Sequence, residues 1–201
     1  MKNYDVIHVS GKPDWSAISP VSIDQHLWSD VHSIVPQAQA AWDENGLYIR
    51  LSVKEKDIKK EFSGPLAPVW EDSCLEFFFS PKGDDRYFNF ECNPNGAFYA
   101  GYGQPIPQRY RLYEDHLPGQ LQVTPFTMPD GWGVEFQVPV SLVQVFVPDF
   151  QLSAGMTLRA NFYKCGDETV QPHFIAWNPI DLPEPCFHCP EFFGRITLKQ
   201  N

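Results

Sequence analysis

The sequence predicts an all-β fold, and three observations support that prediction. Aromatic residues, which favour strands, are abundant, with 16 Phe, 8 Tyr and 6 Trp among 201 residues. The 13 Gly and 19 Pro supply turns and disfavour long helices. Short segments that alternate apolar and polar side chains are bounded by turn residues. Because 43% of the residues are hydrophobic, the chain can bury a core, and we expect one domain over residues 1–201.

Two β-hairpins are predicted most directly. In residues 37–53, QAQAAWDENGLYIRLSV, the turn at 43–46 separates two alternating arms, and Asn-Gly readily adopts the positive φ that a tight reversal needs. In residues 73–92, the arms SCLEFFFS and RYFNFEC flank the turn-rich PKGDD. Both arms of the second hairpin are rich in aromatic residues, which are strong strand formers.

Further strands and one helix complete the predicted fold. The expected strands lie at 38–53, 73–80, 86–92, 121–127, 133–138, 157–163 and 194–198. We expect them to pack as two antiparallel sheets in a β-sandwich of the immunoglobulin or jelly-roll kind. At most one or two short helices should occur, the first at 140–146 after Pro139, and the proline-rich stretch 104–118 should form a loop or sheet edge.

Charge and hydropathy exclude two classes of partner. The chain has 15 basic and 25 acidic residues, a net charge of −10, so it should repel nucleic acid. No apolar run reaches the roughly 18 residues of a membrane span, so no membrane partner is expected. The N-terminus lacks the apolar stretch of a secretory signal. We therefore expect a cytoplasmic protein as the chain is written, or a periplasmic or extracellular one if it is a trimmed mature form.

Catalytic motifs are sparse. The sequence has no G-x-S-x-G, Walker, H-E-x-x-H or G-x-G-x-x-G motif that would indicate a common hydrolase or nucleotide site. Glycoside hydrolysis needs only two carboxylates, and Glu71, Asp72, Glu76 and Glu91 gather on the second hairpin. A paired-carboxylate glycosidase is therefore an alternative, although we expect no catalytic residue.

The cysteines raise the question of a metal. Five cysteines cannot all pair within one chain, so at least one thiol is free. Cys186 and Cys189 flank His188, and Cys165 with His173 could complete a zinc site, but structural zinc usually draws on a second compact ligand pair, which this sequence lacks. Ordinary thiols are the favoured interpretation, no cofactor should be required, and a structural calcium ion with scattered oxygen ligands stays open.

Trp70 precedes a predicted strand and is followed by Glu71, Asp72 and Glu76. An exposed indole can stack on the apolar face of a sugar while a nearby carboxylate accepts hydrogen bonds from its hydroxyls. The alternative is that Trp70 covers one end of the hydrophobic core. This pattern is thus typical of sugar binding without proving it.

The stretch WEDSCLEFFFSP at 70–81 resembles the W-x-x-D-x-x-E-x-F motif of carbohydrate-binding module family 9 and its related domains. Other segments are similar to the opening hairpin, the following strand and the closing N-x-Y, W-x-P and H-x-P-x-x-F-G pattern of the family, over roughly residues 36–198. These segments are AWDENGLYI at 41–49, YFNFECNPNG at 87–96, LRANFY at 158–163, WNP at 177–179 and HCPEFFG at 188–194.

The resemblance implies a β-sandwich that holds a sugar between two Trp side chains without catalysing its breakdown. Carried over by motif, the two stacking residues are Trp70 and Trp177. The other expected ligand-binding residues are Glu76, Asn89 and Glu91 on the second hairpin and Asn178 beside Trp177. Asn89 stands where sugar-binding members carry an Arg, so the sugar's identity does not carry over. We expect a monomer with a carbohydrate ligand, acting beside a separate glycoside hydrolase. A glycosidase or a structural, protein-interaction sandwich without sugar binding remain the alternatives.

Overall fold

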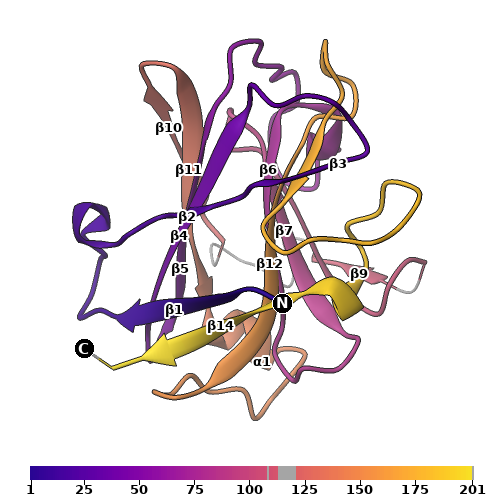
Figure 1. Ribbon diagram of the computed structural model, residues 1–201. Helices are drawn as coiled ribbons and strands as arrows, with labels where there is room; N and C mark the ends of the chain where they lie inside the picture. Colours follow the sequence, from indigo (N-terminus) through magenta and orange to yellow (C-terminus); the bar gives the residue numbers. More distant parts are fainter. Residues whose placement is uncertain (108, 113–120, 201) are drawn as a thin grey trace.

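The computed structural model describes residues 1–107, 109–112 and 121–200, and the chain is nearly all β in these ranges (Figure 1). The strands are β1 (Asn3–His8), β2 (Val21–Ser22), β3 (Gln25–Leu27), β4 (Val35–Asp43), β5 (Gly46–Lys54), β6 (Cys74–Ser80), β7 (Tyr87–Cys92), β8 (Phe98–Gly103), β9 (Arg109–Arg111), β10 (Thr124–Met128), β11 (Gly131–Pro139), β12 (Thr157–Cys165), β13 (Phe174–Ala176) and β14 (Gly194–Lys199). The short α1 spans Val140–Gln144, and single 3₁₀ turns are η1 (Trp15–Ala17), η2 (Val69–Glu71) and η4 (Pro190–Phe192).

Hydrogen bonds join most strands in the order β10-β11-β5-β4-β1-β14-β12-β6-β7-β8-β9. The path curls, so that β4, β5 and β11 form one layer and β6, β7 and β12 form the other, with β1 and β14 crossing below both in Figure 1. Most pairs are antiparallel, but β1 runs parallel to both β4 and β14. The predicted β-sandwich is confirmed, and the two parallel pairings are an addition that strand patterning did not indicate.

The seven predicted strand segments all correspond to strands, the first of them to the hairpin of β4 and β5. The predicted helix is α1, and β10 begins three residues later than expected, at Thr124. Six strands were not predicted: β1, β2, β3, β8, β9 and β13. The predicted loop at 104–118 contains β9, and its residues 108 and 113–118 lie outside the described ranges.

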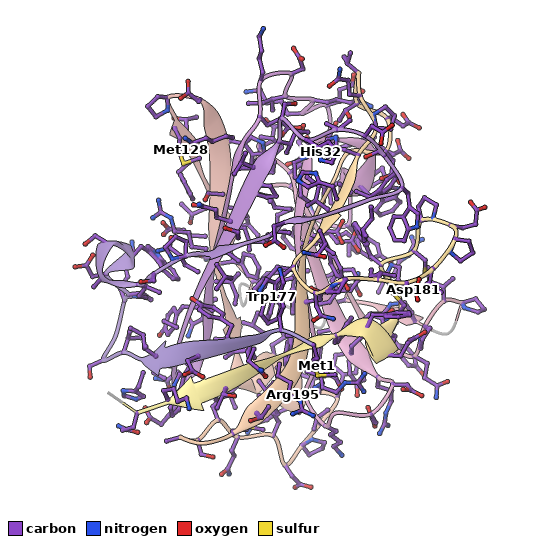
Figure 2. The ribbon with its side chains drawn as sticks, in the orientation of Figure 1. Met1, His32, Met128, Trp177, Asp181 and Arg195 are labelled. Carbon is purple, nitrogen blue, oxygen red and sulfur yellow. The ribbon has the colours of Figure 1, made fainter. Side chains whose placement is uncertain are left out.

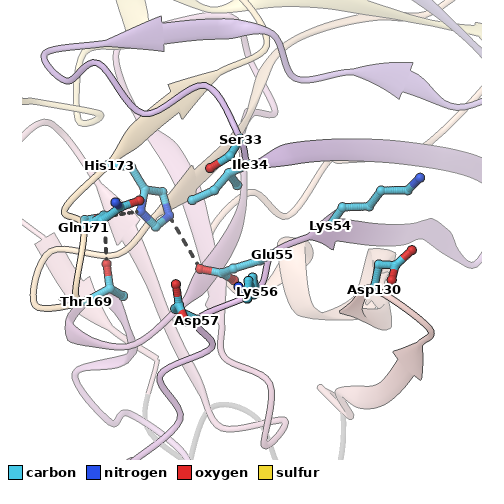
Figure 3. Close-up of a pocket in the computed structure, with 10 residues that line it drawn as sticks. All are labelled: Ser33, Ile34, Lys54, Glu55, Lys56, Asp57, Asp130, Thr169, Gln171 and His173. Carbon is cyan, nitrogen blue, oxygen red and sulfur yellow. Dashed lines mark hydrogen bonds and ion pairs between the residues drawn. The ribbon is translucent and has the colours of Figure 1, made fainter.

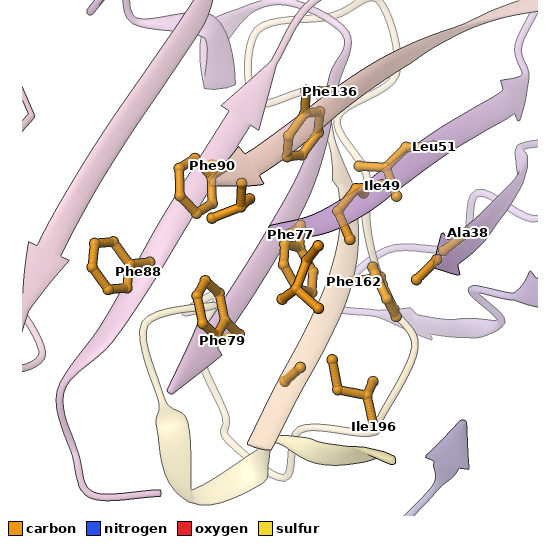
Figure 4. Packing of buried hydrophobic residues seen from close by; sticks show 14 of the residues in the cluster. Ala38, Ile49, Leu51, Phe77, Phe79, Phe88, Phe90, Phe136, Phe162 and Ile196 are labelled. Atoms are coloured by element: carbon orange, nitrogen blue, oxygen red, sulfur yellow. The ribbon is translucent and has the colours of Figure 1, made fainter. Parts of the chain in front are cut away.

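The main core lies between the two layers. Alternation along β6 sends Phe77 and Phe79 inward, where they meet Phe162 of β12 and Phe88 of β7 in ring contacts with centroids 5.1–5.5 Å apart. The facing layer contributes aliphatic side chains such as Ile49 of β5, and Figure 4 shows these residues packed together. This burial is the main source of the fold's stability.

The outer face of β6, β7 and β12 is also covered. Phe78, Tyr87 and Tyr163 point away from the main core and form a second buried cluster under the loops that precede β6 and follow β12. All residues of β6 and β7 are consequently buried, which explains why the sequence of these strands is hydrophobic on both faces. The polar side chains on this outer face are therefore enclosed by protein, and they define the site described next.

Candidate functional site

A cavity of about 560 Å³ opens on the outer face of β6, β7 and β8. Its size lies within the range of small-molecule sites. It is lined by Trp70, Glu76, Glu91, Tyr99, Ile106, Pro107, Arg109, Arg111, Cys165, Asp167, Phe174, Pro185, Cys186, Phe187 and His188. These residues come from strands and loops far apart in the sequence, so the fold assembles the cavity from one end of the sheet and the loops around it.

Aromatic rings form much of the cavity wall. Trp70 is half-buried on the 3₁₀ turn η2, and its ring meets that of Tyr99 on β8 edge to face, with centroids 5.4 Å apart. Phe174 of β13 and Phe187 add a second aromatic pair, with centroids 6.2 Å apart. The cavity thus offers apolar ring surface that can pack against the C–H face of a ligand.

Two carboxyl groups lie among the strand residues that line the cavity. Glu76 of β6 and Glu91 of β7 are direct partners in the antiparallel register, so their side chains emerge side by side. Their residues are 3% and 4% exposed. Glu76 Oε1 accepts from the Cys165 thiol at 3.0 Å, and Glu91 Oε1 accepts from Asn89 Nδ2 at 2.8 Å. Since a carboxylate can accept about four hydrogen bonds, both retain acceptor capacity for a ligand.

The environment of this carboxyl pair keeps it partly protonated near neutral pH. Burial raises the pKa of Glu91 to about 7, against the opposing effects of its hydrogen bond from Asn89 and the charge of Arg109. Burial also raises the pKa of Glu76 well above its usual value, and the charge of Glu91 raises it further. Two adjacent carboxyl groups away from water resist carrying two negative charges together.

Asn89, which was expected to bind the ligand, is bonded instead to an arginine of another strand. Asn89 is fully buried and is not among the residues that line the cavity. Its Oδ1 accepts a hydrogen bond from Arg109 Nη2. The Arg109 guanidinium also donates to the carbonyl oxygens of Tyr87 and Gly103, both at 3.1 Å, and lies 4.0 Å from the centre of the Tyr87 ring. Sequence reasoning missed Arg109, which lies in the proline-rich stretch and belongs to no motif.

His188 also lines the cavity. Its Nδ1 lies 2.7 Å from the hydroxyl oxygen of Tyr87. Burial lowers the pKa of His188 to about 3, with a further lowering from the charge of Arg109, so the imidazole is neutral at physiological pH. His188 therefore presents a neutral polar ring and contributes no positive charge to the cavity.

The expectation that Trp177 faces Trp70 across the ligand is wrong for this structure. Trp177, labelled in Figure 2, is 2% exposed and belongs to the main core. Its ring meets the Phe162 ring edge to face, with centroids 5.7 Å apart. The reason is strand alternation: Phe174 points toward the cavity, so Trp177, three positions later, points to the opposite side. Phe174 and Phe187 supply aromatic surface where the second indole was expected.

Asn178 is likewise not part of the cavity. Its Oδ1 accepts from the backbone N–H of Lys2 at 2.7 Å, and its Nδ2 donates to the carbonyl oxygen of Phe192 at 2.6 Å. It is 5% exposed. Asn178 therefore ties the N-terminal strand to the segment before β14, which is a structural role.

Of the four acidic residues noted on the second hairpin, two line the cavity and two do not. Glu76 and Glu91 line the cavity, whereas Glu71 is half-buried outside its lining and Asp72 is fully buried. Asp72 accepts from the backbone N–H groups of Glu61 and Phe62 and from the side chain of Asn93 at 2.8–3.0 Å. Asp72 thus fixes the loop that positions Trp70.

The zinc site considered for Cys165, His173, Cys186 and Cys189 is not assembled. His173 Nε2 lies 2.6 Å from the ammonium of Lys164, and burial followed by the charge of Lys164 lowers the His173 pKa to about 4. Cys189 donates to the carbonyl oxygen of Cys186 at 3.1 Å. Of the described residues, the one set of thiol, carboxyl or imidazole groups close enough for a metal is Cys74, Glu76 and Cys165.

His173 belongs instead to a separate pocket of about 290 Å³, shown in Figure 3. Beside it, the Lys164 ammonium lies 3.2 Å from Glu55 Oε1, and Glu55 Oε2 accepts from the indole N–H of Trp132 at 2.8 Å. Lys164 and Glu55 are both buried. Lys164, Glu55 and His173 are thus bonded to one another and to Trp132, so we assign this network a structural role.

In the described ranges, no helix has the length and apolar character to cross a membrane.

Comparisons with known proteins agree with this architecture. A Bacteroides uniformis ATCC 8492 structure named "putative carbohydrate-binding protein" is 31% identical, with a TM-score of 0.87 over 98% of this chain and 99% of that chain. A family 9 module from Caldicellulosiruptor kristjanssonii in complex with glucose has 16% identity and a TM-score of 0.70, covering 100% of this chain and 97% of that chain.

A family 9 module from Caldicellulosiruptor kristjanssonii in complex with cellotriose has 15% identity and a TM-score of 0.71, covering 100% of this chain and 95% of that chain. A search of curated proteins gives no match. The sequence profile described as carbohydrate-binding family 9 matches residues 13–198, which is nearly the whole chain. On that match and on the 31% identity over the whole of a solved relative, this chain belongs to carbohydrate-binding family 9.

Proposed function

We propose that this chain is a non-catalytic carbohydrate-binding module and that its ligand is a sugar held in the cavity beside Trp70. The observation that supports this most strongly is the pairing of Glu76 with Glu91 in an aromatic-walled cavity. Two adjacent carboxyl groups with unused acceptor positions suit neighbouring hydroxyl groups of a sugar ring. The half-buried ring of Trp70 suits the apolar face of the same ring.

The arrangement of polar groups favours a neutral sugar over a charged one. The cavity contains both signs of charge, because Glu76, Glu91 and Asp167 are accompanied by Arg109 and Arg111. The terminal nitrogens of Arg109 already donate to backbone carbonyl groups and to Asn89. A ligand with many hydroxyl groups and no net charge can meet donors and acceptors of both kinds without leaving a buried charge unpaired.

Family membership supplies independent support. Similar family 9 modules from Caldicellulosiruptor kristjanssonii have been solved in complex with glucose and with cellotriose, so these two sugars are the natural first probes for this chain. The paired Trp expected from the family does not apply here, because Trp177 is in the core. We further propose that the chain acts as a monomer beside a glycoside hydrolase, where it would keep that enzyme near its polysaccharide.

Titration calorimetry with glucose, cellotriose and a wider glycan panel tests the proposal. Trp70→Ala should weaken binding at least about fivefold, because a stacked aromatic contributes on the order of 1 kcal/mol beyond the area it buries. Glu91→Gln should also weaken binding, since an amide is a weaker acceptor than a carboxylate. Trp15→Ala is the matched control, because Trp15 is a half-buried indole that lines a different groove.

The results separate the alternatives. Binding that depends on Trp70 and not on Trp15 supports the cavity as the sugar site. No binding to any member of the panel by the folded chain would favour a structural sandwich that has lost its ligand. Binding that is unaffected by Trp70→Ala and Glu91→Gln would place the sugar elsewhere and refute the site.

Glycoside hydrolysis is a second candidate because of one observation. Glu76 and Glu91 are adjacent, and burial raises the pKa of both, as expected for a pair in which one group donates a proton and the other stays ionised. We prefer binding because the family is one of carbohydrate-binding modules and because one oxygen of each carboxyl group already accepts from an internal partner, Cys165 or Asn89.

A further inference from the structure

Two thiols and a carboxyl group meet at the base of the cavity. Cys74 and Cys165 are direct partners in the register of β6 and β12, and Glu76 is two residues after Cys74 on the same face of β6. The two sulfur atoms and a Glu76 oxygen all lie within 4.8 Å of one another. The Cys165 thiol donates to Glu76 Oε1 at 3.0 Å. Strand geometry therefore brings three potential ligand atoms to one point.

The three groups differ from an ordinary buried cluster in how they face the cavity. Cys74 is fully buried, whereas Cys165 and Glu76 line the cavity. A metal ion between them would have three protein ligands on the protein side and an open position on the cavity side. Three protein ligands with one open position is the arrangement of zinc sites that also take water or a ligand.

The donor types select for a particular class of metal. Thiolates bind soft and borderline cations such as Zn²⁺ and Cd²⁺, and they are poor ligands for Ca²⁺ and Mg²⁺, which require oxygen. Tetrahedral zinc has Zn–S bonds of about 2.3 Å and Zn–O bonds of about 2.0–2.2 Å. A triangle of donor atoms within 4.8 Å can close around such an ion by side-chain rotation, without moving either strand.

The charges around the cluster are compatible with a cation. Glu91 and Asp167 also line the cavity and add negative charge next to the three ligands. The nearest buried cation is Lys164, which precedes Cys165 and so projects to the other face of β12. Its ammonium is 3.2 Å from Glu55 and 2.6 Å from His173, so its charge is already balanced there.

We propose that Cys74, Glu76 and Cys165 bind one soft divalent cation, Zn²⁺ being the physiological candidate, at the base of the cavity. Binding replaces the S–H protons of both cysteines by bonds to the metal and releases these protons to solvent, so the oxidation states of metal and sulfur are unchanged. The bound metal would present its open coordination position to whatever occupies the cavity.

Cadmium absorption tests this site directly. The full chain, reduced with a phosphine and freed of metal by a chelator, is titrated with Cd²⁺ while the ultraviolet charge-transfer band of cadmium thiolate is recorded. We expect a band that saturates at one Cd²⁺ per chain. Zn²⁺ should remove the band by competition, and an excess of Ca²⁺ should leave it unchanged.

Variants assign the ligands. Cys165→Ser and Cys74→Ala should each cause loss of the saturable band, and Glu76→Gln should weaken Cd²⁺ binding. Cys186→Ser is the matched control, because Cys186 is a half-buried thiol that lines the same cavity but lies outside the cluster. Circular dichroism of each metal-free variant establishes that it is folded. If Cys74→Ala does not fold, the cavity-lining variant Cys165→Ser alone decides whether the cluster binds the metal.

Several outcomes would overturn the proposal. These are no thiolate band in the reduced chain, a band that persists in Cys165→Ser, a band lost in Cys186→Ser, or displacement of Cd²⁺ by Ca²⁺. Thiol counting in the unfolded chain before and after reduction reveals whether the two cysteines form a disulfide instead, and a fully reduced chain that still binds no Cd²⁺ refutes the site. Because no sugar is used, the result is independent of the proposed sugar binding.

Discussion

The guanidinium of Arg109 donates a hydrogen bond to Asn89 Oδ1, and Asn89 Nδ2 in turn donates to Glu91 Oε1. These two hydrogen bonds connect Arg109 on β9 with the Glu91 carboxyl group on β7. Arg109 lies on β9, two strands away from β7, and brings a guanidinium to position 89, where the family resemblance places an arginine. The departure at Asn89 does not remove a guanidinium from the site.

Arg109→Lys should therefore weaken sugar binding while leaving the fold intact. Lysine keeps the charge but cannot reproduce the planar set of donors that Arg109 directs to Tyr87, Gly103 and Asn89. Loss of this support leaves the Asn89 amide free to rotate away from Glu91. Calorimetry against the same sugar panel measures the effect. Unchanged affinity in Arg109→Lys would show that Glu91 needs no support from β9, and Arg111→Lys is the control on the same strand.

The sugar affinity and the stability of the chain should respond to pH in opposite directions. The pKa of Glu91 is raised to about 7, so this group binds a proton in the folded state at pH values where it is ionised in the unfolded chain. Stability should consequently fall as pH rises from about 4.5, the ordinary value, through about 7. Sugar affinity should increase over the upper part of this interval, because an ionised carboxylate is the stronger acceptor.

Denaturant unfolding and calorimetry between pH 5 and pH 8 measure both trends. In Glu91→Gln the affinity should lose most of its dependence on pH, and the loss of stability with rising pH should diminish. An affinity that falls as the pH rises would mean that the protonated carboxyl group donates to the ligand, which contradicts the expected role of Glu91 as an acceptor.

Trp177→Ala should destabilise the fold without a specific effect on sugar binding. Because Trp177 is 2% exposed and packs on Phe162, its removal leaves a cavity in the main core. Large aromatic truncations in cores cost about 3–5 kcal/mol. Thermal unfolding measures this cost, and binding is compared at a temperature where the variant is folded. Trp70→Ala should show the reverse pattern, and weakened binding with unchanged stability in Trp177→Ala would contradict the core assignment.

The buried ion pair of Lys164 and Glu55 gives a prediction about stability alone. Lys164→Met leaves the Glu55 carboxylate without its cation and should cost about 3–5 kcal/mol. Adding Glu55→Gln should recover part of the loss, because a neutral amide needs no counter-charge and its oxygen can still accept from the Trp132 indole. A double-mutant cycle by chemical denaturation measures the coupling, and additive losses would indicate that the two charges are independently satisfied.

No hydrolysis of aryl glycosides or polysaccharides should be detected with the full chain. Glu76 and Glu91 are expected to bind hydroxyl groups and not to react, and the family is one of binding modules. The measurement is release of the aryl group and of reducing ends over a range of pH. Turnover that disappears in both Glu76→Gln and Glu91→Gln while each variant stays folded would establish the glycosidase instead.

Sequence patterning located the elements whose two faces are chemically distinct or strongly apolar. β6 and β7 were predicted because aromatic residues run between clear turn signals, whereas β8, FYAGYG, was missed because two of its six residues are glycine. The parallel pairings of β1 depend on contacts across the whole chain, which no local pattern encodes.

The site was predicted in part for a similar reason. Trp70, Glu76 and Glu91 were found because they belong to a motif on consecutive strands, and the structure brings all three to one cavity. Trp177 was misplaced because the side to which it points depends on which residues of β13 face the cavity, and this three-residue strand has no alternating sequence pattern of its own. Arg109 and Phe187 lie on separate segments that only the folded chain brings together.

The central place of β1 in the sheet also constrains the order in which the fold can be completed. β1 is the strand between β4 and β14, and its residue Asn3 pairs with Arg195. During vectorial synthesis, β4 can pair with β5 early, but β1 gains its second neighbour only after β14 has emerged. Pairing at such a sequence separation carries a high loop-closure cost and slows folding. Until that moment the hydrogen-bonding edge of β1 that faces β14 is open to chaperones and to other chains.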